Sequence, residues 1–549
     1  MFTVKDIEIK NIDHLGIVAG IIDSIGLVEI INGLVGEEKG EKISAGLAVK
    51  AMILNGLGMV SQPLYMFSRF FENIACEHLL GAGVKAKYLN DDKLGRVMDK
   101  CFLTGPDTIF LAVSLKAVKI FGVSLATSHL DSSSFHVHGE YKTQLPEVVF
   151  SSSKSENSAE ESERKSPVAI NITHGYSRDH RPDLKQFITE LICSGDGGVP
   201  IFLKSASGNQ VDCSCFGEIA LSYQKQLQLD GLIVADCALY TETNLQLMTD
   251  IKWLCRVPMT INEAKLLVSS LLESELKKSP KNPGYLYVEK NVNYAGIEQR
   301  WLVVQSQVRR ESDLRKLSKK IESSHTSEKA KLKKLSDKKF ACSADAVKAL
   351  LEVAEKFKYH QVSNIKITEK TPSAKEEKQD KYYQISAELA RNENTIERET
   401  LAAGRFIIAT NVKSSEFLSS ESMISEYKAQ QSCERGFRFL KDPLFFADSI
   451  FIKSPERIEA LAMIMGLCLL VYTLAQRHIR AALSSSKSTL KNQLGKPIEN
   501  PTLRWIFQCF QSIHLVTFNQ ETEISNLTPD RTFILSFFPE SCHYYYKYI

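Results

Sequence analysis

The sequence predicts an α/β protein in which a mixed sheet is flanked by helices and is preceded by a helical N-terminal domain. Up to about residue 122, apolar side chains recur at three- and four-residue spacing, which is typical of helices with one buried face. From Leu125 onward, short runs of apolar and β-branched residues alternate with helical stretches. That alternation indicates strands joined by helices.

Length and composition set the broad class. The 549 residues are enough for roughly two to four domains, each with its own core. Hydrophobic residues make up 44% and charged residues 24% of the chain, which are ordinary values for a globular protein. The formal charge of +3 is too small to indicate a nucleic-acid partner by itself, so any basic surface must be local.

The cysteines and the first residues bear on the compartment. Twelve cysteines are scattered along the chain without a CxxC pair. Cys213 and Cys215 lack a partner cluster, so we do not expect zinc. Reduced, mostly buried thiols in a cytosolic protein are the better interpretation. Residues 1–10 carry charges and lack the apolar core of a signal peptide.

Three helices are predicted in the N-terminal domain. Ser44 can cap a helix over residues 45–59. Asparagine and two aspartates give a start signal for a second helix over residues 91–101, and a third is expected over residues 106–121. The sequence contains no recognisable helix-turn-helix, so scaffolding and DNA binding both remain open as roles of this domain.

Two aspartates belong to predicted strands. Asp131 lies inside a predicted strand over residues 127–137, where a carboxylate is costly to bury unless it is paired or binds a cation. A turn or capping role is the alternative. Asp236 ends the apolar run at residues 231–235, which fits a buried parallel strand. Ligand-binding residues of open α/β sheets gather at such strand ends.

Other local patterns complete this part of the chain. His136 and His138 could suggest a metal, but alternation places both on the strand face opposite Asp131, so a structural role is preferred. Residues 151–166 are rich in Ser and Glu and are expected to form an exposed loop. Further strands are expected at residues 168–173, 198–205 and 252–257, and helices at residues 213–229 and 243–248.

A charged helix is predicted over residues 427–443, and Pro443 supplies its stop. Its side chains advance by three or four residues along one face: Tyr427, Gln430, Glu434, Phe437 and Lys441. A single carboxylate, Glu434, stands among the cations Arg435, Arg438 and Lys441. This layout suits a metal ligand flanked by groups that hold phosphates. A solvated surface helix is the alternative.

This helix resembles the last catalytic motif of the insertion-sequence DDE transposases. In the matching subgroup, of the insertion-sequence-four superfamily, the helix reads Tyr, two residues, Arg, three residues, Glu, six residues, Lys. Tyr427, Glu434 and Lys441 fall at these spacings, and Gln430 stands where the family has Arg. Residues 175–186, Gly-Tyr-Ser-Arg-Asp-His-Arg-Pro-Asp-Leu-Lys-Gln, resemble a segment of the same transposases that differs only in having Lys at the fourth place.

The resemblance implies an RNase H-like core and a metal-dependent DNA transposase of a bacterial-type insertion sequence. It implies that Asp131, Asp236 and Glu434 are catalytic and hold two Mg²⁺ ions, for which Mn²⁺ can substitute. The DNA-binding residues it implies are Tyr427, Gln430, Arg435, Arg438 and Lys441. The expected partner is double-stranded DNA, at the element ends and the target, bound by a dimer in the cytoplasm with no membrane involved. A nuclease that cuts without joining, and an inactive copy that binds ends, remain open.

The spacing of the carboxylates implies a domain organisation. The stretch between Asp236 and Glu434 is too long for an uninterrupted RNase H-like core, so an inserted domain is expected. It would contain strands at residues 285–289 and 301–308 and a charged helical stretch at residues 311–336. For that stretch a solvated helical hairpin and a DNA contact both remain open. The expected N-terminal domain covers residues 1–122. The core covers residues 123–260 and 401–485, with the insertion at residues 261–400 between its two parts. The C-terminal region covers residues 486–549.

The most apolar run of the chain lies at residues 458–475. Its length is close to that needed to span a membrane, although Glu459 and Thr473 interrupt its ends. A helix buried inside a domain is the stronger interpretation.

Overall fold

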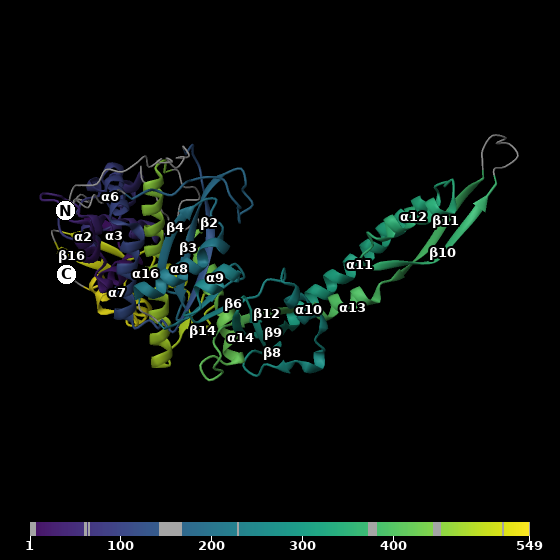
Figure 1. The fold of residues 1–549 in the computed structure, drawn as a ribbon. Helices are drawn as coiled ribbons and strands as arrows, with labels where there is room; N and C mark the ends of the chain where they lie inside the picture. The colour runs from purple at the N-terminus through teal and green to yellow at the C-terminus, as the bar shows by residue number, and fades with distance from the viewer. Residues whose placement is uncertain are drawn as a thin grey trace, which may run out of the picture. The chain divides into compact units, whose positions relative to one another are not determined.

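The computed structural model describes residues 7–59, 63, 66–141, 167–227, 230–371, 381–442, 452–518 and 521–547 (Figure 1). The chain divides into two compact units. The first comprises Met1–Trp253 and Lys428–Ile549, and the second comprises Leu254–Tyr427. The expected exposed loop at residues 151–166 and the expected helix stop at Pro443 lie outside the described residues.

The first unit begins with a helical region, as the sequence predicts. The Ser44 hydroxyl accepts a hydrogen bond from the Leu47 N–H, and the Asn90 side chain accepts one from the Lys93 N–H, so both expected caps are present. The elements are β1 (Ile7–Asn11), α1 (Leu15–Ile25), α2 (Leu27–Val35), α3 (Ala45–Gly56), α4 (Phe67–Phe70), α5 (Cys76–Leu80), η3 (Ala86–Tyr88), α6 (Asp91–Thr104) and α7 (Pro106–Phe121).

The main sheet of the described residues is mixed and has nine strands, in the order β4-β3-β2-β5-β6-β12-β9-β8-β7. The β2–β3 and β3–β4 pairs are antiparallel, whereas β2 and β5 are parallel. The strands are β2 (Thr127–Val137), β3 (Lys185–Ser194), β4 (Pro200–Ser207), β5 (Leu232–Ala235), β6 (Trp253–Arg256), β7 (Lys277–Lys278), β8 (Tyr285–Tyr294), β9 (Ile297–Ser306) and β12 (Arg405–Thr410). The predicted α/β class, with a mixed sheet, flanking helices and a helical N-terminal region, is confirmed.

Helices cover both faces of β2. The Ser128 hydroxyl lies 3.0 Å from the Tyr223 hydroxyl of α8 (Asp212–Leu227). On the other face, the Phe135 ring lies 6.4 Å from the Phe437 ring of α15 (Gln431–Leu440). Because successive residues of a strand point to opposite faces, the even-numbered residues of β2 face α8 and the odd-numbered ones face α15.

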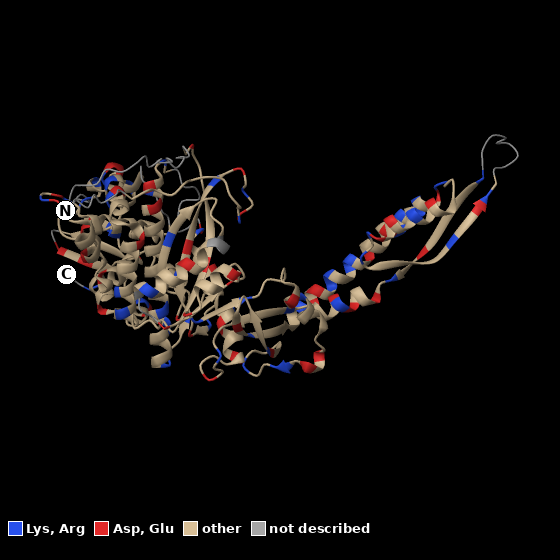
Figure 2. Ribbon diagram, in the orientation of Figure 1, with Lys and Arg blue, Asp and Glu red and all other residues tan. Residues whose placement is uncertain are grey.

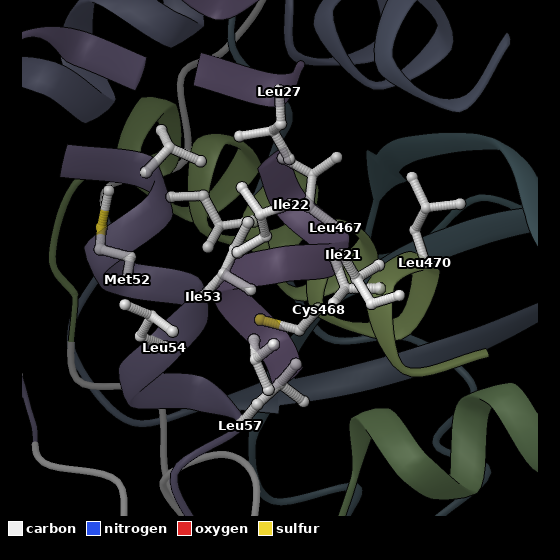
Figure 3. Close-up of a cluster of buried hydrophobic side chains, with 14 of the residues drawn as sticks. Ile21, Ile22, Leu27, Met52, Ile53, Leu54, Leu57, Leu467, Cys468 and Leu470 are labelled. Atoms are coloured by element: carbon white, nitrogen blue, oxygen red, sulfur yellow. The ribbon is translucent and has the colours of Figure 1, made fainter. Parts of the chain in front are cut away.

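The apolar run near residue 460 forms α16 (Pro455–Ser486), which is long and apolar enough to cross a membrane by length and composition. Two bent helix pairs, α1 with α2 and α6 with α7, also pass that test as pairs. However, 83% of the apolar window of α16 is buried inside the structure. Figure 3 shows Leu467, Cys468 and Leu470 of α16 among side chains of α1, α2 and α3. The predicted buried helix is confirmed.

Burial also affects Glu459 of α16, whose carboxylate accepts a hydrogen bond from the Ile170 N–H at 2.8 Å. Desolvation raises the pKa of this carboxyl from 4.5 to about 7. The pKa of Glu459 is higher in the folded protein than in the unfolded chain. The protonated carboxyl therefore contributes stability to the folded state below about pH 4.5, and this contribution is lost as the pH rises through about 7.

We therefore expect Glu459→Gln to raise the free energy of unfolding by about 2–3 kcal/mol at about pH 8 and to change it little at about pH 4.5. Urea denaturation at the two pH values measures the difference. An equal change at both would show that ionisation of Glu459 does not oppose folding.

The sequence misplaced one strand of the first unit. Residues 168–172 are not in a strand, and Thr173 forms only an isolated bridge to Gln186. The antiparallel partner of β2 is instead β3, which was not predicted. The β-branched run at 168–173 suits a strand locally, but its Val168 is exposed and the hydrogen-bonding partners of β2 come from residues 185–194.

The second unit, which lies between the two parts of the first unit in the sequence, contains the expected strands and helices. The expected charged hairpin of two helices is wrong, because residues 307–336 make one continuous helix. The C-terminal part of this helix packs in a small apolar core of Leu332, Leu335, Leu350, Phe357 and Ile385.

The first unit also contains α9 (Glu242–Leu247). The remaining elements of the second unit are α10 (Asn262–Ser270), η4 (Glu273–Glu275), α11 (Gln307–Ser336), α12 (Ser343–Ala354), β10 (His360–Lys370), β11 (Tyr382–Arg391), α13 (Glu393–Ala402) and α14 (Ser420–Ala429).

The C-terminal part returns to the N-terminal helices of the first unit. The Tyr546 hydroxyl donates to the Asp13 carbonyl oxygen at 2.5 Å and accepts from the Ile17 N–H at 3.2 Å. Strand β15 pairs with both β1 and β16. The elements here are β13 (Leu490–Lys491), β14 (Pro497–Ile498), α17 (Leu503–Cys509), β15 (His514–Phe518), β16 (Glu521–Ser525), α18 (Pro529–Leu535) and α19 (Glu540–Tyr544).

Candidate metal and DNA site

The two predicted aspartates stand at neighbouring positions of adjacent strands. In the parallel β2–β5 pair, Leu130 lies opposite Ala235. Asp131 and Asp236 are each one residue further along, where β5 has just ended. Neighbouring strands are about 4.8 Å apart. The fold therefore brings together two carboxylates that are 105 residues apart in the sequence (236 − 131).

Asp131 belongs to the sheet face that α15 covers. Asp131 lies opposite Leu191 of β3, and the Leu191 side chain lies beside Gly436 of α15. The Cys433 thiol of α15 donates to the His129 carbonyl oxygen of β2 at 3.0 Å. Burial raises the pKa of this thiol, and nearby Cys193 and Asp131 raise it further. Helix α15 is thus packed next to Asp131.

Each aspartate accepts a backbone hydrogen bond. The Asp131 carboxylate accepts from the Ser132 N–H and that of Asp236 from the Ala238 N–H, both at 2.8 Å. Each bond ties a carboxylate to the backbone that follows it, inside β2 for Asp131 and just beyond β5 for Asp236. Carboxylate oxygens are the ligands that Mg²⁺ and Mn²⁺ prefer, so the aspartate pair fits a hard divalent cation.

Glu434, the third predicted carboxylate, follows Cys433 on α15 and is exposed. Within the described residues it makes no hydrogen bond or ion pair. In that same part of the chain, no group of three or more His, Cys, Asp or Glu side chains is gathered as a metal site. The register therefore places Asp131 and Asp236 at neighbouring strand positions, and Glu434 lies on the helix packed next to Asp131, outside such a group.

The predicted helix over residues 427–443 is interrupted. Helix α14 ends at Ala429 and α15 starts at Gln431, so Gln430 lies in a turn between them. Gln430 and Phe437 are buried, whereas Glu434 is exposed. The five spaced residues therefore differ in exposure and do not form one exposed surface. The local sequence contains no Gly or Pro at the break, so no signal for it was available.

The cations predicted to bind DNA differ in environment. Arg435 and Arg438 of α15 are exposed. Lys441, at the end of α15, donates to both oxygens of Asp179 at 2.9 and 2.8 Å. Tyr427 belongs to the second unit, where its ring lies 5.8 Å from that of Phe406.

Arg178, which sequence reasoning did not assign to the site, is close to Asp131. Its Nη1 lies 3.8 Å from Asp131 Oδ1, and its Nη2 donates to the Ser132 hydroxyl at 2.9 Å. The signal was the segment at residues 175–186, which the resemblance singled out without a chemical role. The ion pair of Asp179 with Lys441 spans 262 residues, so local pattern could not reveal it.

Glu190 was also missed, because β3 was not predicted. It is 1% exposed and lies opposite Ser132 of β2, which places it on the α8 face. There its Oε1 accepts from Gln210 Nε2 at 2.8 Å. Glu190 therefore lies on the sheet face opposite Asp131.

Two histidines of β2 lie in different environments. His136 Nδ1 lies 3.8 Å from Asp179 Oδ2. Burial lowers the pKa of His129 to about 4.

Comparisons with known proteins match one family model and several solved structures. A profile described as a domain of unknown function (DUF4277) matches residues 7–115, a region that ends before Asp131. No curated protein matches the chain. Among solved structures, the cryo-EM structure of the piggyBac transposase synaptic complex with hairpin DNA is similar at a TM-score of 0.36 and 8% identity, over 97% of this chain and 82% of that one.

Proposed function

We propose that this chain is a divalent-metal-dependent DNA transposase that cuts at the ends of an insertion sequence and joins the freed ends to target DNA. The observation that carries the proposal is the register of the parallel β2–β5 pair, in which Asp131, inside β2, and Asp236, directly after β5, occupy neighbouring positions, with Asp131 on the sheet face that α15 covers. The spacing of Tyr427, Glu434 and Lys441 and the segment at residues 175–186, which resemble those of insertion-sequence DDE transposases, support the same reaction class.

The proposed roles follow from charge and position. Asp131 and Asp236 hold the cations, and Glu434 completes the ligand set from α15. When bound between these carboxylates, two such cations would supply activation of a water or a 3′-hydroxyl and stabilisation of the leaving oxygen of an in-line displacement. Lys441 holds a phosphate near the cut, and exposed Arg435 and Arg438 contact the neighbouring backbone. This chemistry needs no covalent bond between protein and DNA.

One assay separates the proposed function from its alternatives. Purified protein is incubated with Mg²⁺ and DNA that carries the ends flanking its gene. Joined products support a transposase, whereas nicks without joining indicate a nuclease. A retarded band without cutting indicates a protein that only binds the ends. Chelation of the metal with EDTA should abolish both cutting and joining.

Helix α11 offers a second DNA-contacting surface. Figure 2 shows its Lys and Arg residues along the helix. The exposed cations are Arg309, Arg315, Lys316, Lys319, Lys320, Lys329, Lys331, Lys333 and Lys334. Of its acidic residues, Glu311 and Glu322 are exposed, Asp313 is half-buried, and Glu328 is buried and lies 2.8 Å from His360. The exposed side of the helix is thus predominantly basic, which suits phosphate contacts without base readout.

We expect the double substitution Lys319→Gln/Lys320→Gln to weaken DNA binding and to reduce the slope of log K against log salt by about 0.9 for each phosphate that the variant no longer neutralises. Electrophoretic mobility shifts at several salt concentrations measure this slope. Lys277→Gln/Lys278→Gln in β7 removes the same charge from another exposed adjacent pair of the second unit and is the matched control. A slope for the α11 variant equal to that of the wild type would show that these lysines do not contact DNA.

A further inference from the structure

The segment at residues 177–183 is tied to the same strand as Asp131. The Arg178 N–H donates to the Ser134 hydroxyl of β2 at 3.2 Å. The Arg178 guanidinium donates to the Ser132 hydroxyl at 2.9 Å. Two bonds from one residue to alternate serines of β2 fix the backbone and the side chain of Arg178 beside the aspartate.

Two consecutive residues of this segment present opposite charges to the site. Arg178 places a cation 3.8 Å from the Asp131 carboxylate. Asp179 places an anion on Lys441 Nζ at 2.8 Å. In the proposed reaction, Asp131 receives a metal cation and Lys441 receives a DNA phosphate. Arg178 therefore places a positive charge where the metal cation would bind Asp131. Asp179 places a negative charge where the phosphate would bind Lys441.

These pairs are partly shielded from water. The Asp131 side chain is 16% and the Lys441 side chain 25% exposed, and their partners Arg178 and Asp179 are 34% and 32% exposed. Charges about 4 Å apart interact more strongly there than on an open surface, where water screens them. By contrast, Arg181 and Asp183 of the same segment pair at 2.8 Å with 45% and 59% exposure.

We propose that Arg178 and Asp179 are positioning residues that neutralise Asp131 and Lys441 in the free protein and are displaced when a divalent cation and a DNA phosphate bind. This inference rests on the proposed function. A guanidinium close to Asp131 opposes a second cation there, and a carboxylate on Lys441 opposes a phosphate. Each internal pair is thus coupled negatively to the binding of one ligand, and this coupling is reciprocal.

The first test measures Mn²⁺ affinity of the full chain by calorimetry, without DNA. Arg178→Gln removes the charge while retaining a side chain that can donate to Ser132, and should tighten Mn²⁺ binding about five- to tenfold. Arg178→Lys retains the charge and should bind as the wild type does. Arg181→Gln removes the same charge from the neighbouring exposed pair and is the matched control. Unchanged or weaker binding by Arg178→Gln, with a folded protein, would reduce Arg178 to a structural role.

The second test measures affinity for a short blunt-ended duplex in EDTA. Asp179→Asn frees Lys441 and should tighten binding about fivefold more than Asp183→Asn, which makes the same change in net charge. Equal affinities of the two variants would overturn the role of Asp179. The thermal midpoint of each variant checks that the fold is retained.

Asp131→Asn distinguishes failure of this inference from failure of the proposed function. If the wild type and Asp131→Asn bind Mn²⁺ equally, Asp131 is not a ligand and the proposed function fails. If Mn²⁺ binding depends on Asp131 but Arg178→Gln leaves it unchanged, only the inference about Arg178 fails.

Discussion

Asp131→Asn and Asp236→Asn are each expected to lower cleavage and joining of DNA by about a hundred- to a thousandfold or more while leaving DNA affinity nearly unchanged. Asparagine has the shape of aspartate and keeps an oxygen that can accept from the Ser132 or Ala238 N–H, each 2.8 Å away in the present structure. The substitution therefore removes the charge that a cation requires without removing the local hydrogen bond.

End-labelled DNA in Mg²⁺ gives the cleavage rate, and mobility shifts in EDTA give the affinity. Asp230→Asn is the matched control, since Asp230 is exposed and precedes β5, whereas Asp236 follows it. Glu434→Gln decides the role of the third carboxylate. A decrease equal to that of the aspartate variants would assign Glu434 to the ligand set. Full activity of either aspartate variant would remove that residue from the site.

The strand that carries Asp236 could be predicted because its signal is local. The run at residues 231–235 is apolar and short, and it forms β5 at residues 232–235. The strand that carries Asp131 shows the same agreement, at residues 127–137. What the sequence could not give is their register, because parallel pairing joins residues distant in the chain.

The strand at residues 185–194 was missed because the residues that form a strand depend on which segment can hydrogen-bond with the neighbouring strand. Residues 168–173 and 185–194 both contain β-branched and apolar side chains, and only the second set pairs with β2. Glu190 was missed together with this strand. In a buried strand a carboxylate weakens the hydrophobic pattern, although here Gln210 and Cys215 donate to it.

The sequence predicted which residues of α15 belong to the candidate site, but it did not predict their interaction partners or their burial. Spacing identified Glu434 and Lys441 on a helix, but the partner of Lys441 is Asp179, far away in the sequence. A three- or four-residue spacing gives the angular position of a side chain only while the helix is continuous. A turn at Gln430 separates α14 from α15, although the Gln430 backbone is itself helical at φ −53° and ψ −23°. The burial of Gln430 beside the exposure of Glu434 follows from packing, which spacing alone does not give.

Gly20→Val is expected to lower the free energy of unfolding of the first unit by about 3 kcal/mol or more. A Cβ at Gly20 of α1 would lie 2.4 Å from the Cα of Cys542 and 2.5 Å from its backbone nitrogen in α19. Backbone atoms cannot rotate away as a side-chain tip can, so α1 and α19 must separate. Separation would also weaken the bond between the Tyr546 hydroxyl and the Ile17 N–H.

Gly33→Ala is the matched control, because a Cβ at Gly33 of α2 meets nothing within 4 Å. Alanine favours the helical backbone over glycine by about 0.5–1 kcal/mol, so this variant should be slightly more stable than the wild type. Chemical denaturation followed by circular dichroism measures both variants. The opposite signs expected for two glycines in neighbouring helices separate close backbone packing from helix propensity. A Gly20→Val protein as stable as the wild type would mean that α19 does not pack on α1 in solution.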